Sequence, residues 1–148
     1  MIIRTSLDLP AVVRKSLEAY SAGDPVTLSE GFDQHAQCLV QFDPKLGKRI
    51  GLKQPSKPVL ADGAIGIMDF YASEFAAFEV TYLDVLSAMR AGRDVAAVCE
   101  WGVRLRGSGL IVAGRCHNIW TLDSQGRKII EGRSVCKIIT PEWDKPIN

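Results

Sequence analysis

The spacing of apolar residues after position 78 is the feature that most narrows the folds open to this chain. In four consecutive segments, apolar and polar side chains alternate with a period of two, the pattern of β-strands with one buried face. Short sequences typical of hairpin turns separate the segments: Ala91-Gly92, Gly107-Ser108-Gly109 and Ser124-Gln125-Gly126. We therefore expect four antiparallel strands, at about residues 79–89, 94–106, 110–122 and 128–140.

The first part of the chain has the spacing of helices instead. Val13, Leu17 and Tyr20 recur at three- and four-residue intervals, so a helix is expected from about Pro10 to Ala22. Asp8 is placed to cap this helix, because an aspartate side chain can accept hydrogen bonds from the first turn.

Further helical signals follow along the chain. A second short helix is expected to open at Pro25, followed by a strand that ends near Phe42. The prolines, glycines and lysines of residues 43–62 predict a loop, and loops of that length are often functional lids. Apolar residues at helical spacing return in residues 63–78, where we expect a third helix.

Composition limits the class of protein. A chain of 148 residues with 47% hydrophobic residues is in the range of one domain, so residues 1–148 are interpreted as a single unit. Eighteen basic residues against seventeen acidic ones, without a basic block, argue against a nucleic-acid partner. Charged residues interrupt the first 22 positions and no other segment approaches a membrane span, so we expect a soluble, cytoplasmic protein without a membrane partner.

The predicted strands place one polar side chain and several small ones on the buried face. Asn118 falls among the apolar residues of its strand, and Gly132, Ser134 and Cys136 share a face of the next one. Small residues leave room where a filled core needs bulk. Asn118 either makes a structural hydrogen bond, to backbone or to Tyr20, or donates into a ligand cavity, because a buried amide needs a partner.

The cysteines do not form a recognisable metal motif. Cys38, Cys99, Cys116 and Cys136 are widely spread and contain no C-x-x-C pair, so we interpret them mainly as small buried hydrophobic residues. A zinc site made by His35, Cys38, Cys116 and His117 is the weaker alternative, since zinc ligands normally come in tight pairs. We predict neither a metal nor another cofactor.

Short motifs along nearly the whole chain resemble one family. The run from Asn118 to Arg127 looks like the hairpin of ketosteroid isomerases and SnoaL-like proteins, in which a polar residue eight positions before the glycine points into the active site. Four further sequences resemble the family in the same order: Ala22-Gly23-Asp24, Asp43-Pro44, Gly63 to Tyr71 and Gly92-Arg93-Asp94-Val95. The resemblance implies the nuclear transport factor 2-like superfamily. Its fold is α+β, with three N-terminal helices packed on a curved, mostly antiparallel sheet that forms a cone with an internal pocket.

The resemblance also implies roles for particular residues. In ketosteroid isomerases an aspartate base moves a proton next to a carbonyl while a tyrosine and a protonated aspartic acid donate hydrogen bonds to the oxygen. By position, Asp43 resembles the base, and Asn118 stands in place of the aspartic acid, whose hydrogen bond an amide can also donate. The family's tyrosine position is Ser16 here, too short to reach the same point, and Tyr20 lies one helical turn later.

Alternatives remain for three of the candidate residues. Strand alternation turns Asp43 away from the pocket unless a bulge intervenes, and a turn-starting role before Pro44 is equally compatible with the sequence. His35 and His117 are also candidates for acid-base chemistry at neutral pH. The favoured position for His35 is a helix-to-strand junction. His117 is expected on the polar face of its strand, in solvent or at a subunit interface.

The sequence thus supports two hypotheses. The first is a cofactor-free acid-base enzyme that isomerises, cyclises, dehydrates or hydrolyses a small apolar molecule, with Asp43, Asn118 and Tyr20 as catalytic groups. Its ligand-binding residues are expected to be Ser16, Cys99, Trp101, Cys116, Trp120 and Ser134. The second is a binding or assembly module without catalysis, since one fold hosts both uses.

A homodimer is expected under either hypothesis. An open antiparallel sheet leaves one face uncovered, and the resemblance implies pairing through that sheet. The apolar residues expected on its outer face are Val98, Ile119, Val135 and Ile139.

Overall fold

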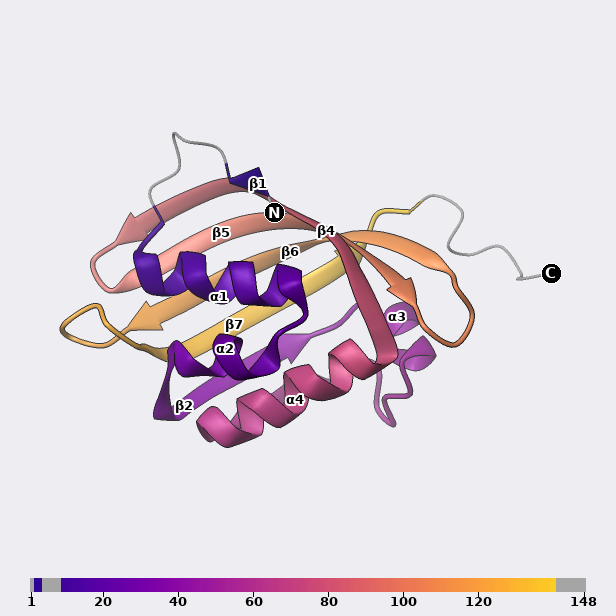
Figure 1. The fold of residues 1–148 in the computed structure, drawn as a ribbon, viewed down its shortest axis with the longest axis horizontal. Helices are drawn as coiled ribbons and strands as arrows, with labels where there is room; N and C mark the ends of the chain where they lie inside the picture. The colour runs from indigo at the N-terminus through magenta and orange to yellow at the C-terminus, as the bar shows by residue number, and fades with distance from the viewer. Residues whose placement is uncertain (1, 4–8, 141–148) are drawn as a thin grey trace.

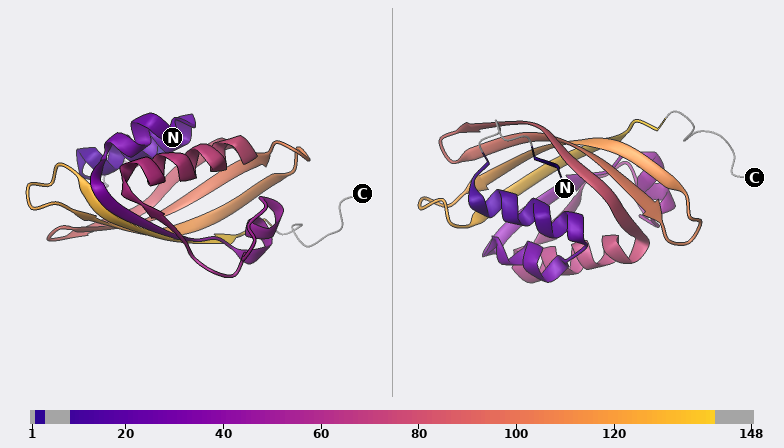
Figure 2. Two further views of the ribbon diagram at one scale, coloured as in Figure 1. Left: turned by 90° about the horizontal axis from the view of Figure 1, so that it is seen from below. Right: turned by 45° about the horizontal axis from the view of Figure 1, so that its top comes forward.

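A seven-stranded sheet organises the computed structural model, which describes residues 2–3 and 9–140 (Figure 1). In spatial order its strands are β1 (Ile2–Ile3), β4 (Phe78–Ala91), β5 (Asp94–Leu105), β6 (Ile111–Leu122), β7 (Ile129–Ile138), β2 (Phe32–Gln41) and β3 (Val59–Asp62). The β1–β4 and β2–β7 pairs are parallel, and the other neighbours are antiparallel. The sheet is strongly curved, as its views from other directions make plain (Figure 2).

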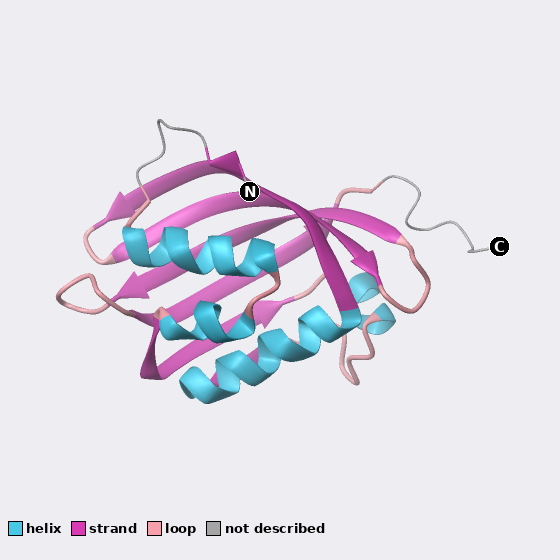
Figure 3. Ribbon diagram, in the orientation of Figure 1, coloured by secondary structure: helices cyan, strands magenta, loops and turns pink. Residues whose placement is uncertain are grey.

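Three helices lie against one face of this sheet: α1 (Ala11–Ala22), α2 (Pro25–Glu30) and α4 (Gly63–Ala77) (Figures 1 and 3). Gly23 ends α1 in the left-handed conformation at φ 68°, a geometry that glycine adopts without steric cost. The Asp24 side chain then caps α2 by accepting a hydrogen bond from the Thr27 amide at 3.1 Å. None of the described helices is long and apolar enough to cross a membrane.

The main expectations about the architecture are confirmed. The fold is α+β with a curved, mostly antiparallel sheet, and the four expected strands correspond to β4, β5, β6 and β7. The helices expected at residues 10–22 and 63–78 correspond to α1 and α4. Asp8, the expected cap of the first helix, lies outside the described residues.

The expectation of a loop over residues 43–62 is wrong. This segment contains a fourth helix, α3 (Pro44–Arg49), and the strand β3. Asp43 caps α3 through its side chain, with Pro44 in the first turn, the same combination that opens α2 at Asp24 and Pro25. The proline therefore starts a helix here, because its missing amide proton is not needed in the first turn.

The inner face of the sheet consists of rows of side chains fixed by the strand register. Two rows of mostly small residues cross β5, β6 and β7: Ala97, Asn118 and Ser134 in one, and Cys99, Cys116 and Cys136 in the other. The flanking rows each contain a tryptophan beside a glycine, with Trp101 opposite Gly114 on one side and Trp120 opposite Gly132 on the other. The sheet thus forms a shallow floor of small side chains between two bulky walls.

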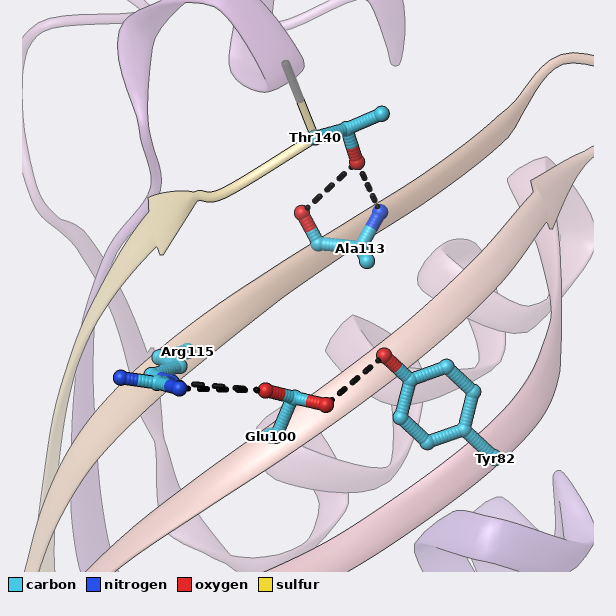
Figure 4. A network of polar contacts seen from close by, with 5 residues as sticks. All are labelled: Tyr82, Glu100, Ala113, Arg115 and Thr140. Atoms are coloured by element: carbon cyan, nitrogen blue, oxygen red, sulfur yellow. Dashed lines mark hydrogen bonds and ion pairs between the residues drawn. The ribbon is translucent and has the colours of Figure 1, made fainter.

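The outer face of the sheet is divided into a polar and an apolar part. Glu100 accepts a hydrogen bond from the Tyr82 hydroxyl at 3.2 Å and pairs with Arg115 at 3.4 Å (Figure 4). The Thr140 hydroxyl accepts a hydrogen bond from the Ala113 amide and donates one to the Ala113 carbonyl oxygen. Farther along the same face, large apolar side chains are exposed: Leu39, Leu60, Met89, Ile119 and Val135. Four of them, Met89, Ile119, Leu39 and Leu60, lie in one row across the sheet. In the strand register this row runs Met89, Ala96, Ile119, Arg133, Leu39, Leu60.

Substituting alanine for Gly114 tests the packing of Trp101 on β6. A Cβ atom at position 114 would collide with the Trp101 ring and lie 2.6 Å from the Lys137 carbonyl oxygen, which is backbone and cannot turn away. We expect G114A to lower the free energy of unfolding by about 1–3 kcal/mol, the usual cost of overpacking, as measured by urea denaturation.

Gly66 provides the matched control, because an added Cβ there meets no atom within 4 Å. G66A should stabilise the protein by about 0.5–1 kcal/mol through the higher helix propensity of alanine. Equal effects of the two substitutions would contradict the close packing of Trp101 on Gly114.

Candidate functional site

A cavity of about 90 Å³ lies over the floor of small side chains. Side chains from α1, α2, α3, α4 and the sheet line it, and most are apolar or aromatic. All the residues expected to bind a ligand, together with two of the three expected catalytic residues, are on its wall: Ser16, Tyr20, Cys99, Trp101, Cys116, Asn118, Trp120 and Ser134. The two tryptophans thus bound the cavity without filling it.

Asn118 lies on the cavity wall with its side chain only weakly engaged. Its Nδ2 donates to the Cys116 carbonyl oxygen at 3.4 Å, a long hydrogen bond. It also lies near the Cys99 thiol on the neighbouring strand, whose pKa it lowers against the larger effect of burial. An amide carries two N–H donors, so these weak contacts leave it able to donate to a molecule in the cavity.

Asp43 is not among the residues that line the cavity. One of its carboxylate oxygens accepts a hydrogen bond from the Lys45 amide at 3.0 Å, and the other accepts one from the Ile138 amide at 3.1 Å. These bonds cap α3 and hold it to the end of β7. The structure therefore makes Asp43 a helix cap, neither the turn residue nor the base considered from the sequence, and does not bring it together with Asn118 on the cavity wall.

Glu74 is the carboxyl group that the structure places on the cavity wall, and the sequence analysis did not single it out. It comes from α4, its side chain is buried, and Oε2 has no hydrogen-bond partner among residues 2–3 and 9–140. Burial raises the pKa of the Glu74 carboxyl to about 8, because desolvation penalises the charged form. The group is thus mostly protonated at neutral pH but titrates within one unit of it.

A signal for Glu74 was present in the sequence. Ile67, Phe70, Tyr71 and Phe75 define the apolar stripe by which α4 packs on the core, and Glu74 occupies a position inside that stripe. An acid on the apolar face of a helix must be desolvated on folding, so it differs from the many acids that face solvent.

Two tyrosines accompany Glu74 on the wall. The rings of Tyr20 and Tyr71 lie 5.9 Å apart, edge to face, and each also packs against Phe75. Burial raises the pKa of both hydroxyls well above the ordinary value, with smaller contributions from the nearby Glu74 and a cysteine thiol. Both hydroxyls therefore stay protonated at neutral pH and remain hydrogen-bond donors.

These groups form a connected line along the wall. Glu74 and Cys99 both lie close enough to raise the pKa of the Tyr20 hydroxyl, and Asn118 lies close enough to Cys99 to lower the pKa of its thiol. Glu74, Tyr20, Cys99 and Asn118 are therefore neighbours on the wall of an otherwise largely apolar cavity, with a titratable carboxyl group at one end and a neutral amide donor at the other.

The cysteines require a correction. Cys116 and Cys136 are joined by a disulfide across β6 and β7, with Cα atoms 4.2 Å apart, so they are not free hydrophobic residues. Cys38 and Cys99 are free and buried, and burial raises the pKa of each thiol to about 12. These two thiols stay protonated at neutral pH, which makes them poor nucleophiles.

The zinc alternative finds no support in the described part of the chain. It contains no group of three or more His, Cys, Asp or Glu side chains able to hold a metal ion. Cys38 is buried on β2 and Cys116 is in the disulfide, whereas His35 and His117 are exposed.

Comparison with known proteins gives similarity in structure without similarity in sequence. No protein-family model matches the sequence, and no curated protein matches it either.

Several solved structures share the fold. A hypothetical protein from Catenulispora acidiphila with a ketosteroid isomerase-like fold, solved in complex with trimethylamine, has a TM-score of 0.68 at 18% identity, over 86% of this chain and 85% of its own. A protein assigned as a SnoaL-like polyketide cyclase from Shewanella denitrificans has a TM-score of 0.62 at 14% identity, over 85% and 88%. TerC, co-crystallised with polyporic acid, has a TM-score of 0.64 at 15% identity, also over 85% and 88%.

These similarities define the class of fold. The chain has the fold that these ketosteroid isomerase-like and SnoaL-like proteins share, which confirms the resemblance in the sequence at the level of fold. Chemistry does not follow from the fold alone, because one architecture hosts many activities.

Because its pKa is raised by folding, Glu74 should make the free energy of unfolding fall as the pH rises from 4.5 to 8. The folded state holds this proton up to a pKa of about 8, while the unfolded chain loses it near the ordinary value of 4.5. Stability from this group is complete below pH 4.5 and falls as the pH rises toward 8, with a slope approaching about 1.4 kcal/mol per pH unit. E74Q should remove this component, as measured by urea denaturation between pH 5 and pH 9.

Glu79 offers a matched control, because it is exposed on β4, shortly after α4. E79Q should keep the slope of the native protein. If the native protein and E74Q lost stability with pH in parallel, Glu74 would not be the group that titrates.

Proposed function

We propose that this protein binds a small, mostly apolar molecule in the cavity and exchanges a proton with it through Glu74. The observation that carries the proposal is the buried carboxyl group on the cavity wall, whose Oε2 has no partner in the described chain and whose pKa is about 8. A pKa near the working pH is what general acid-base catalysis requires.

The chemistry follows from the groups on the wall. The Glu74 carboxylate accepts a proton from the carbon next to a ligand carbonyl, and the electrons of that C–H bond move to the carbonyl oxygen. The Asn118 amide and the Tyr20 hydroxyl are the neutral donors available to the developing enolate, whose charge is stabilised by such hydrogen bonds. Return of the proton from Glu74 to carbon or oxygen completes an isomerisation and regenerates the carboxylate.

The size of the cavity favours a ligand of few heavy atoms. At about 90 Å³ it is smaller than the roughly 150 Å³ apolar cavity that accommodates benzene in another protein. The complexes of two fold relatives, with trimethylamine and with polyporic acid, support a small-molecule role for the site.

Exchange of carbon-bound protons tests the proposal without knowledge of the natural substrate. Small cyclic ketones such as cyclopentanone are incubated with the protein in D₂O, and loss of their α-protons is followed by NMR. Because the carboxylate is the active base, the catalysed rate should rise with pH and level off above the Glu74 pKa of about 8. E74Q should slow exchange by about 10²-fold or more, and N118A by about 10²-fold, the usual cost of losing one donor to an enolate oxygen.

Asp43 gives the control that separates the two candidate bases. D43N should leave the exchange rate per folded molecule unchanged, because both carboxylate oxygens of Asp43 are engaged with backbone amides. A rate that depends on Asp43 but not on Glu74 would reverse the assignment. Ligand binding without any exchange would favour the binding module over the enzyme.

We also propose that two copies pair through the outer face of the sheet. Ile119, Val135 and Ile139, three of the residues expected there, are between 42% and 47% exposed, which is unusual for large apolar side chains on adjacent strands. Met89 and Leu60, which the sequence analysis did not include, are 70% and 56% exposed on the same face. Contiguous apolar surface of this kind marks interaction sites.

A charge on this apolar patch should prevent pairing. The native protein is expected to sediment as a dimer at micromolar concentration, and I119K as a monomer, because a lysine would be desolvated at the centre of the contact. Ile65 is 74% exposed on α4, away from the sheet, so I65K should remain dimeric. A monomeric native protein would exclude the dimer.

A further inference from the structure

The unpaired Glu74 oxygen is the most unusual polar atom in the described structure. A buried acceptor without a partner costs about 1–3 kcal/mol, and Glu74 is only 6% exposed. One basic residue, Arg133, is among the described residues of the wall. Its side chain is 63% exposed and pairs with Glu131 at 2.9 Å. The described chain therefore supplies no cation to Glu74.

A cluster of aromatic rings includes two that share the cavity wall with Glu74, those of Tyr20 and Tyr71. Tyr71 and Phe75 come from the same helix as Glu74, with ring centroids 6.2 Å apart, and Tyr20 reaches them from α1 at 5.9 Å and 5.4 Å. The faces of aromatic rings attract cations, and most strongly in desolvated sites. A carboxyl group among aromatic rings combines two features that each favour a positive charge.

The number of free acceptors limits the kind of cation. A primary ammonium carries three N–H donors and needs three acceptors, as a lysine side chain does. Glu74 Oε2 is the one fully buried side-chain oxygen without a partner in the described chain, and most of the wall around the cavity is apolar, so it offers few acceptors for three such donors. A tertiary ammonium has a single N–H, and its alkyl groups suit the apolar remainder.

Resting on the proposed small-molecule function, we propose that the ligand carries a tertiary alkylammonium group, seated in the cavity against Glu74 and beside Tyr20 and Tyr71. Its N–H donates to Glu74 Oε2, and its alkyl groups pack on the rings. The cavity of about 90 Å³ sets the size, so the ligand is a compact amine of few heavy atoms.

The pairing has a definite dependence on pH. The cation binds the carboxylate form, so binding below pH 8 releases the Glu74 proton, and the affinity rises as the pH approaches 8. The other titratable groups near Glu74 are Tyr20, Tyr71, Cys38 and Cys99, all of which keep their protons in this range. The amine itself, like a lysine side chain, loses its proton only around pH ~10.

Calorimetric titration with three probes of similar shape tests the inference: trimethylammonium, tetramethylammonium and the uncharged tert-butanol. For the native protein at pH 8 we expect trimethylammonium to bind at least tenfold more tightly than tert-butanol. Tetramethylammonium should fall between them, because it has charge but no N–H. The trimethylammonium affinity should rise about tenfold per pH unit between pH 6 and pH 7, where Glu74 must ionise to bind it.

Two variants identify the groups responsible. E74Q should lose at least tenfold in trimethylammonium affinity, together with the pH dependence, and keep its affinity for tert-butanol. Y71L should weaken tetramethylammonium binding without a matching loss for tert-butanol, while E79Q should match the native protein. Circular dichroism establishes that each variant is folded.

Equal affinities for trimethylammonium and tert-butanol in the native protein would overturn the inference, as would unchanged cation binding by E74Q or no binding of any probe. Its failure is distinguishable from failure of the proposed proton transfer. If ketone exchange depends on Glu74 but the protein shows no preference for the cation, the inference of an ammonium ligand fails and the proposed proton transfer stands. If cation binding depends on Glu74 but no ketone exchange is catalysed, the proposed acid-base chemistry fails and the inference of an ammonium ligand stands.

Discussion

The register of three antiparallel strands is the constraint on which the rest of this structure depends. Because β5, β6 and β7 pair without interruption at their centres, Cys99, Cys116 and Cys136 lie side by side, and so do Ala97, Asn118 and Ser134. A shift of one residue in any strand would turn its side chains to the opposite face. The floor of the cavity, the position of the amide and the disulfide all follow from this one pairing.

The register also explains why the cavity stays open. Each tryptophan stands opposite a glycine on the next strand, Trp101 beside Gly114 and Trp120 beside Gly132, so each ring extends over its neighbour's backbone. The bulky rings are thereby kept to two flanking rows, and the rows between them contain side chains too small to fill the space. The helices close the space from the other side (Figure 2).

Much of this arrangement could be predicted from the sequence, because strand alternation and hairpin turns are local signals. They were sufficient to expect Asn118, Trp101 and Trp120 on one inner face. The disulfide was not predictable in the same way, since positions 116 and 136 meet only once the register of the hairpin is known. The helix α3 was missed for another reason, because Asp43-Pro44 was interpreted as a turn although Asp24-Pro25 was correctly interpreted as a helix start.

The choice between Asp43 and Glu74 shows where sequence reasoning about the site reached its limit. Asp43 was favoured by resemblance in position, yet its oxygens are occupied by backbone amides at the end of β7. Glu74 carries no motif, and its importance comes from the tertiary structure, which removes it from water and leaves one oxygen unpaired. Periodicity on α4 could have indicated its burial, but only the packing of α1 and the sheet around it could show that no group in the described part of the chain pairs with its Oε2.

A carboxyl group buried in this way makes folding less favourable and binding more selective for the same physical reason. Desolvation raises its pKa and leaves its oxygen without a donor, so the empty site bears a cost that a suitable ligand relieves. A ligand of the same shape that lacks a donor or a charge cannot relieve it, and polar sites reject such analogues far more strongly than apolar pockets do. Selectivity in this cavity therefore depends less on its apolar walls, which many small molecules could contact, than on the single unsatisfied oxygen that few of them can satisfy.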